Sequence, residues 1–178
     1  MSQPSFTRRM TADVRQVLGS LSQSPGSARR VAVPAEARAL SMLAHVDYAD
    51  AFTVPAHGPE RTPEQWTRAV LEDAPLTAQR FLHRLLSAVG LQLGPIGADG
   101  FIVGWKMHRS TAEYVLLGTQ GPRIGLRAEL LFRPERQRLL WATFVQQDNV
   151  TARAAWAGMG VLHRRVVPYL LGRATSSR

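Results

Sequence analysis

The chain of 178 residues contains no cysteine. Without thiols, a disulfide framework, an iron–sulfur cluster, a thiolate zinc site and a cysteine nucleophile are all excluded. The five histidines include no pair at the helical spacing of metal ligands, so we expect neither a metal nor another cofactor. No apolar run approaches the roughly 18 residues that a membrane-spanning helix requires. The sequence therefore predicts a cytoplasmic protein without a membrane span.

Lysine is almost absent as well. Of the 22 basic residues only Lys106 is a lysine, and the net charge is +9. An arginine-rich surface raises the non-specific affinity for polyanions, but it does not by itself specify a partner. No recognition helix or RNA-binding sheet motif accompanies the charge, so we do not expect a nucleic acid as the partner.

Residues 1–30 are expected to form an N-terminal extension and linker. Apolar side chains from Met10 to Leu21 recur at helical spacing, which predicts a short amphipathic helix. The polar stretch that follows, up to Arg30, is rich in serine, proline and glycine and is typical of a linker. We expect a single domain over residues 31–174 and a tail over residues 175–178.

The first half of this domain predicts one strand followed by two short helices. Residues 46–54 alternate between two faces, as in a strand. Thr62 and Gln65 then supply the two side chains of a capping box around a proline at the first helical position. This helix is expected to end near residue 72, and a second apolar stripe over residues 78–89 ends at a glycine.

From Phe101 onward the apolar period changes from 3.6 to 2, which predicts four strands separated by turns. The first of them places Phe101, Val103, Trp105 and Met107 on one face. Residues 123–133 alternate apolar and polar side chains, which indicates a sheet with one wet face. A long helix over residues 149–172 follows, interrupted near its end by a proline.

The order of elements predicts an α+β fold. A curved antiparallel sheet of about five or more strands, packed on the long C-terminal helix, would bury the one-sided faces of both. Such an arrangement can leave an internal cavity between the sheet and the helix.

Four segments carry a family resemblance. They are residues 47–52 (DYADAF), the helix that contains Trp66, residues 142–145 (ATFV) and residues 163–171 (HRRVVPYLL). Together they are similar to an uncharacterised bacterial family within the START-like (helix-grip, SRPBCC-type) superfamily, over about residues 34–174. The resemblance implies a helix-grip fold with two helices after the first strand and a ligand cavity, and it implies no established activity.

Asp50 is the strongest candidate for a functional polar residue, because it shares a strand face with Tyr48 and two apolar residues. If that face is buried, the carboxylate must be paired or have a raised pKa. His163 borders the apolar face of the C-terminal helix, where it would reach a cavity as a proton carrier. We predict that Asp50, His163 and Tyr48 are the catalytic residues if the chain is an enzyme. The structural alternatives are an aspartate paired with an arginine or a helix-end amide, and a histidine bonded to a neighbouring strand or carbonyl.

Aromatic and thioether side chains on the inward faces favour a pocket for a flat or apolar ligand. They suit an ordinary hydrophobic core equally well. The predicted lining residues are Phe52, Trp105, Met107, Tyr114, Leu126, Trp141, Trp156 and Met159.

Three functions are open on the sequence alone. The first is a protein that binds a small apolar or aromatic organic molecule in the cavity. The second is a cofactor-independent cyclase, dehydratase or isomerase of the polyketide cyclase type, in which Asp50 or His163 moves protons and Tyr48 polarises a carbonyl. The third is an interaction module that presents its arginine-rich face to an acidic partner. A cavity above about 300 Å³ would favour the first two.

Overall fold

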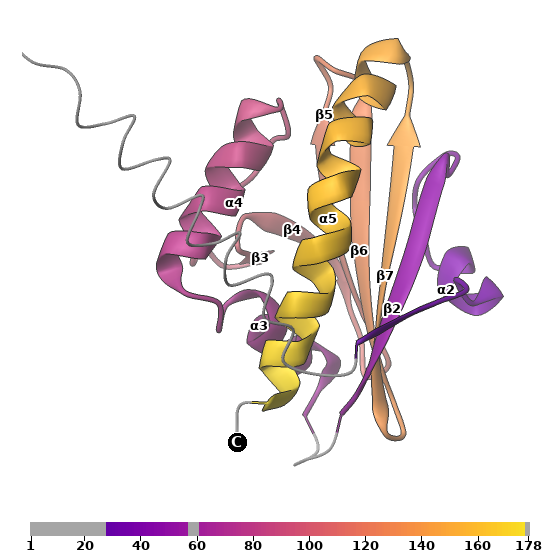
Figure 1. Ribbon diagram of the computed structural model, residues 1–178, viewed down its shortest axis with the longest axis vertical. Coiled ribbons are helices and arrows are strands. Elements are labelled where there is room, and N and C mark those ends of the chain that lie inside the picture. Colours follow the sequence, from indigo (N-terminus) through magenta and orange to yellow (C-terminus); the bar gives the residue numbers. More distant parts are fainter. Residues whose placement is uncertain (1–27, 57–60, 177–178) are drawn as a thin grey trace, which may run out of the picture.

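The computed structural model describes residues 28–56 and 61–176. An antiparallel sheet forms its centre, with helices on either side (Figure 1). The predicted helix over residues 11–21 and most of the predicted extension lie outside the described residues. The elements in chain order are β1 (Arg29–Val31), α2 (Ala35–Ala39), β2 (Tyr48–Pro55), α3 (Pro63–Leu71), α4 (Leu76–Ala88), β3 (Phe101–Ile102), β4 (Trp105–Ser110), β5 (Val115–Gly121), β6 (Leu126–Glu135), β7 (Arg138–Gln147) and α5 (Val150–Ser176).

The sheet has seven strands in the order β1-β2-β7-β6-β5-β4-β3, and each neighbouring pair is antiparallel. It is open, with β1 and β3 as its edges. The first of these edges was not predicted, because Arg29 and Arg30 read as the end of the linker. The last strand, β7, pairs with β2 and so brings the two ends of the domain together.

The two faces of the sheet are both covered. One face packs against α3 and α5 through a core that includes Phe132 and Leu171. The other face packs against α2 and the segments around it through a second core that includes Ala37 and Phe144. The prediction of one wet face is therefore wrong in the middle of β6, where Leu131 is fully buried beneath this second layer.

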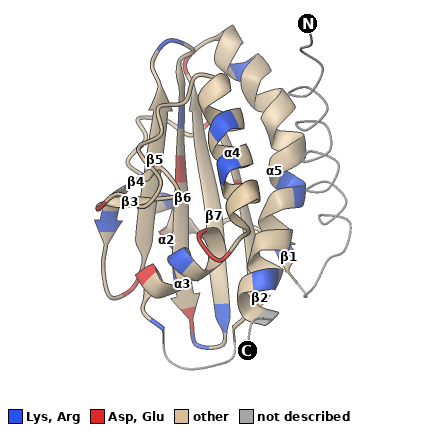
Figure 2. Ribbon diagram, turned by 90° about the vertical axis from the view of Figure 1, so that its left-hand side faces the viewer, with Lys and Arg blue, Asp and Glu red and all other residues tan. Residues whose placement is uncertain are grey.

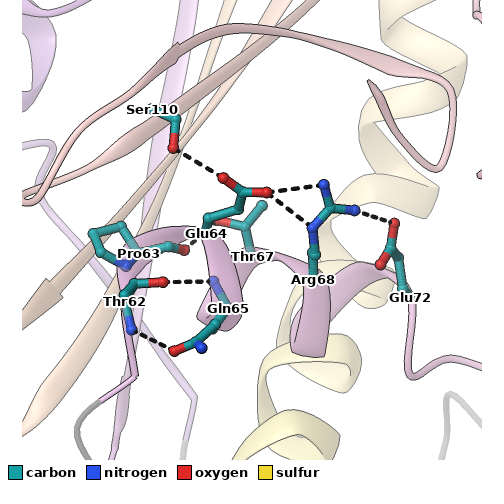
Figure 3. Close-up of polar contacts among 8 residues, drawn as sticks. All are labelled: Thr62, Pro63, Glu64, Gln65, Thr67, Arg68, Glu72 and Ser110. Carbon is teal, nitrogen blue, oxygen red and sulfur yellow. Dashed lines mark hydrogen bonds and ion pairs between the residues drawn. The ribbon is translucent and has the colours of Figure 1, made fainter. Parts of the chain in front are cut away.

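Helix α3 begins as predicted. The Thr62 hydroxyl accepts a hydrogen bond from the Gln65 backbone N–H at 3.2 Å, and the Gln65 side chain accepts one from the Thr62 N–H at 2.9 Å (Figure 3). These bonds satisfy two of the N–H groups that a helix start leaves free. On the next turns Arg68 lies between the carboxylates of Glu64 and Glu72, and Glu64 also accepts a hydrogen bond from Ser110 of β4 (Figure 3).

Two local predictions need correction. The strand expected from Phe101 to Met107 is broken into β3 and β4 by a two-residue turn at Val103 and Gly104, so that Ile102 pairs with Trp105. The glycine, at φ 83°, permits the reversal. The last helix is not interrupted at Pro168 but continues to residue 176. The proline removes one backbone N–H from its ladder without ending it.

Candidate functional site

The polar centre of the molecule is built on β2. Because side chains two apart on a strand share a face, Tyr48 and Asp50 both point toward α5. Asp50 is only 2% exposed. It accepts a hydrogen bond of 2.6 Å from the Tyr48 hydroxyl, and its Oδ1 lies 3.2 Å from Nε2 of His163 on α5. The structure thus brings together the three residues that the sequence nominated.

The pairing favours the ionised form of Asp50 and sets the tautomer of His163. Burial by itself raises the pKa of Asp50, but the hydrogen bond and charge of His163 and the hydrogen bond from Tyr48 outweigh burial and hold it below its usual value. An ionised carboxylate only accepts hydrogen bonds, so Nε2 of His163 carries the hydrogen. Whenever the ring is neutral its lone pair is therefore on Nδ1, and within the described residues no hydrogen bond reaches Nδ1. In that form the ring can accept a proton at Nδ1.

Tyr48 is held in its neutral form. Burial raises the pKa of its hydroxyl, and so do the hydrogen bond to Asp50 and the charge of that carboxylate. The ring packs on Trp156 with centroids 5.0 Å apart, and Trp156 packs on His163 at 5.6 Å. These aromatic contacts limit the rotamers of both side chains that bond Asp50.

An apolar cavity of about 120 Å³ lies between the sheet, α4 and α5, and His163 lines it. This volume is below the 300 Å³ at which pockets for drug-sized molecules begin. Four of the predicted lining residues do line it, namely Trp105, Trp141, Trp156 and Met159. The cavity can take a small apolar group rather than a large flat ligand.

The other predicted lining residues are not among those that line this cavity. Phe52 and Met107 pack with the core beneath α3 and α5. Leu126 is fully buried in a third cluster with Trp156. Tyr114 lies on the opposite face of the sheet, because Met107 pairs with Leu117 and the register then shifts within β4 between Met107 and Arg109.

Three polar lining residues were missed from the sequence: Gln79 and His83 of α4, and Thr143 of β7. The Gln79 amide donates to two backbone carbonyls at the end of α3, and Nε2 of His83 lies 3.0 Å from the carbonyl oxygen of Gly94. The spacing of four residues between Gln79 and His83 on a helix was the available signal, since it places both on one side. Thr143 lies directly opposite Asp50 in the β2–β7 register, which only the fold reveals.

Within residues 28–56 and 61–176, no group of three histidine, aspartate or glutamate side chains is placed to hold a metal ion. Of the helices in the same ranges, none combines the length and the hydropathy needed to cross a membrane.

Comparison with known families gives a match to an acetyltransferase domain. Residues 36–98 match the model of the acetyltransferase (GNAT) domain PanZ. The matched part is about a third of the chain and spans α2 to α4, so it contains Tyr48, Asp50 and the α4 wall of the cavity. Strands β3 to β7 and helix α5, with His163, lie outside it. A search of curated proteins finds no match.

This match corrects the family prediction. It is to an acetyltransferase domain and not to a START-like family, so the predicted START-like, SRPBCC-type resemblance is wrong. The predicted helix-grip fold class is wrong for the same reason. The observed sheet is open and has seven antiparallel strands. The same match contradicts the predicted ligand carrier, the cyclase, dehydratase or isomerase, and the interaction module, because an acetyltransferase domain indicates acyl transfer.

Proposed function

We propose that this protein transfers a short acyl group from an activated ester to an amine, with His163 as the general base. The observation that carries the proposal is the bond of His163 Nε2 to the buried carboxylate of Asp50, beside an apolar cavity. A base of this kind is what an amine nucleophile needs, because the amine must lose a proton as it attacks. The match of residues 36–98 to an acetyltransferase domain supports the same reaction class.

The proposed transfer needs no reactant besides the thioester donor and the acceptor amine. The acceptor nitrogen forms a bond to the acyl carbon while Nδ1 of His163 takes its proton. The bond from the acyl carbon to the sulfur of a thioester donor then breaks, and the imidazolium returns the proton to the leaving thiolate. The products are an amide and a thiol. Asp50 stabilises the transient imidazolium charge and holds the ring in the required tautomer.

The cavity is large enough for the acyl group but too small for the carrier of that group. About 120 Å³ of apolar space accepts a short hydrocarbon chain, and the carrier of that chain must remain outside. Figure 2 shows basic residues spaced along α4 and α5. Both helices contribute residues that line the cavity. Five of the basic residues are exposed: Arg80, Arg84, Arg153, Arg164 and Arg165. Their charge favours a carrier that is an anion.

The test is thiol release from acetyl-coenzyme A in the presence of a panel of primary amines. Because the chain has no cysteine, a thiol-reactive dye reports only the product and never the protein. We expect amine-dependent thiol release by the wild type. His163→Ala should lower kcat by at least about 100-fold, the range of a lost general base. Asp50→Asn should lower kcat as well, because an amide no longer selects the reactive tautomer.

A matched control exists on the surface. His45 Nε2 lies 3.2 Å from Asp47 Oδ2, the same separation as in the cavity pair, but the His45 side chain is 52% exposed. His45→Ala should therefore leave turnover unchanged. No amine-dependent thiol release by the folded wild type, or equal rates in the wild type and His163→Ala, would contradict the proposal.

A further inference from the structure

Val103 has a positive φ, which a β-branched side chain disfavours. It occupies the first position of the turn between β3 and β4 at φ 49°, and Gly104 follows at φ 83°. Within the described residues, Val103 is the only residue other than glycine with a positive φ. Two-residue turns of this type favour asparagine or glycine, because a β-branched side chain clashes with its own backbone there.

The side chain of Val103 forms part of the cavity wall. Val103 is 8% exposed, packs in the core beneath α5 and lines the apolar cavity. A residue that lowers turn stability and yet fills a binding cavity is the combination expected when strain is retained for a role at a site.

Contacts with Gly94 and His83 also hold the turn in place. The Gly94 N–H donates to the Gly104 carbonyl at 2.8 Å, and the Gly94 carbonyl in turn lies 3.0 Å from His83 Nε2. A Cβ on Gly104 would lie 2.8 Å from both the Gly94 oxygen and the His83 ring. The backbone next to Val103 is therefore packed closely against Gly94 and His83, which opposes its outward movement when a longer chain enters the cavity.

We propose that Val103 determines acyl-chain length in this cavity, so that the donor carries a short acyl group. This inference rests on the proposed acyl transfer and adds the substrate class to it. The isopropyl group, held by a strained turn on a closely packed wall, closes space that a longer chain would need. Acetyl and butanoyl groups fit, and hexanoyl does not.

The test compares the acetyl, butanoyl and hexanoyl thioesters of N-acetylcysteamine with the wild type, Val103→Ala and Val103→Gly. We expect the ratio of kcat/KM for hexanoyl to that for acetyl to rise at least about tenfold in both variants, as for other pockets that gain one or more methylenes. Val115→Ala is the matched control, because Val115 is fully buried in the same core but does not line the cavity. An unchanged ratio in a folded, active Val103 variant would overturn the inference.

Strain provides a second readout that does not depend on turnover. Glycine normally lowers stability relative to alanine, but at a positive φ the order reverses. Val103→Gly should therefore melt at or above the temperature of Val103→Ala, and a clearly lower melting temperature for the glycine variant would remove the strain argument.

Failure of acyl transfer itself is distinguishable. If the wild type releases no thiol from any thioester, the proposed reaction is wrong, and the cavity is then probed with the S-ethyl and S-hexyl thioethers of N-acetylcysteamine by thermal shift. Stabilisation of Val103→Ala but not of the wild type by the hexyl compound would support a length limit at Val103. Equal shifts in the two proteins would overturn it.

Discussion

Asp50 and His163 lie 113 positions apart in the sequence and 3.2 Å apart in the structure. One comes from the first long strand and the other from the last helix, so their contact joins the two ends of the domain. The carboxylate side chain is fully buried and the imidazole is 14% exposed, so neither partner can exchange the other for water at low cost.

Removal of the carboxylate should therefore destabilise the protein. Asp50→Ala leaves the His163 ring and the Tyr48 hydroxyl without their partner in a buried place, and we expect a loss of about 3 kcal/mol in the free energy of unfolding. Asp50→Asn keeps an acceptor oxygen for Tyr48 and should lose less. Urea unfolding at neutral pH measures both. Equal stability of the wild type and Asp50→Ala would show that the pair contributes nothing to folding.

The same pair sets the response of stability to acid. The pKa of Asp50 is lower in the folded protein than its ordinary value of about 3.9. Its charge therefore stabilises the fold above that value, and the contribution is lost as the pH falls through the lower folded-state pKa. We expect the wild type to lose more stability than Asp50→Asn between about pH 5 and pH 2. Parallel pH curves for the two proteins would contradict this assignment.

At alkaline pH the ionisation of Tyr48 changes the stability in the opposite direction, so that stability falls as the pH rises. Its pKa is raised in the folded protein, so the neutral hydroxyl stabilises the fold below the ordinary value of about 10 and the contribution is lost as the pH rises through the raised pKa. Tyr48→Phe should remove this alkaline component from the unfolding curve.

Periodicity predicted that these polar residues face inward, but it did not predict the contact between Asp50 and His163, for which the expected partner was an arginine or a helix-end amide. Positions 48 and 50 share a face because a strand repeats every two residues, and position 163 borders the buried stripe of a helix that repeats every 3.6. The turn at Val103 was missed because its conformation opposes the local preference of valine. The second layer over β6 was missed because Glu129 finds its partner Ser41 across 88 positions of sequence.

Glu129 anchors this second layer and makes a separate prediction. Its carboxylate is 2% exposed and accepts hydrogen bonds from the Ser41 hydroxyl at 2.7 Å and from the Met42 N–H at 3.1 Å. The Met42 N–H also lies 3.2 Å from the other carboxylate oxygen, so in either orientation of the amide Glu129→Gln places an NH2 donor against this N–H, at a cost of about 1–2 kcal/mol. Hydrogen exchange of the Met42 amide should accelerate by about tenfold, since 1.4 kcal/mol corresponds to that factor. Glu135→Gln, on the exposed end of the same strand, should leave this amide unchanged.

Gly118 is explained by the imidazole that lies over it. A Cβ at this position would be 2.3 Å from Cε1 of His108, whose Nδ1 lies 3.9 Å from Oε1 of Glu129. Gly118→Ala must therefore displace the ring, and we expect a loss of about 1–2 kcal/mol in the free energy of unfolding, as for other overpacked contacts.

The cause is separable from the general effect of alanine in a strand by a double-mutant cycle. In a His108→Ala background the space above Gly118 is free, so Gly118→Ala should cost little or nothing there. The two substitutions should be coupled by at least about 0.5 kcal/mol, which chemical unfolding of the four proteins can resolve. If Gly118→Ala costs the same in both backgrounds, the ring is not what excludes a side chain from this position, and the backbone of β5 itself must require the glycine.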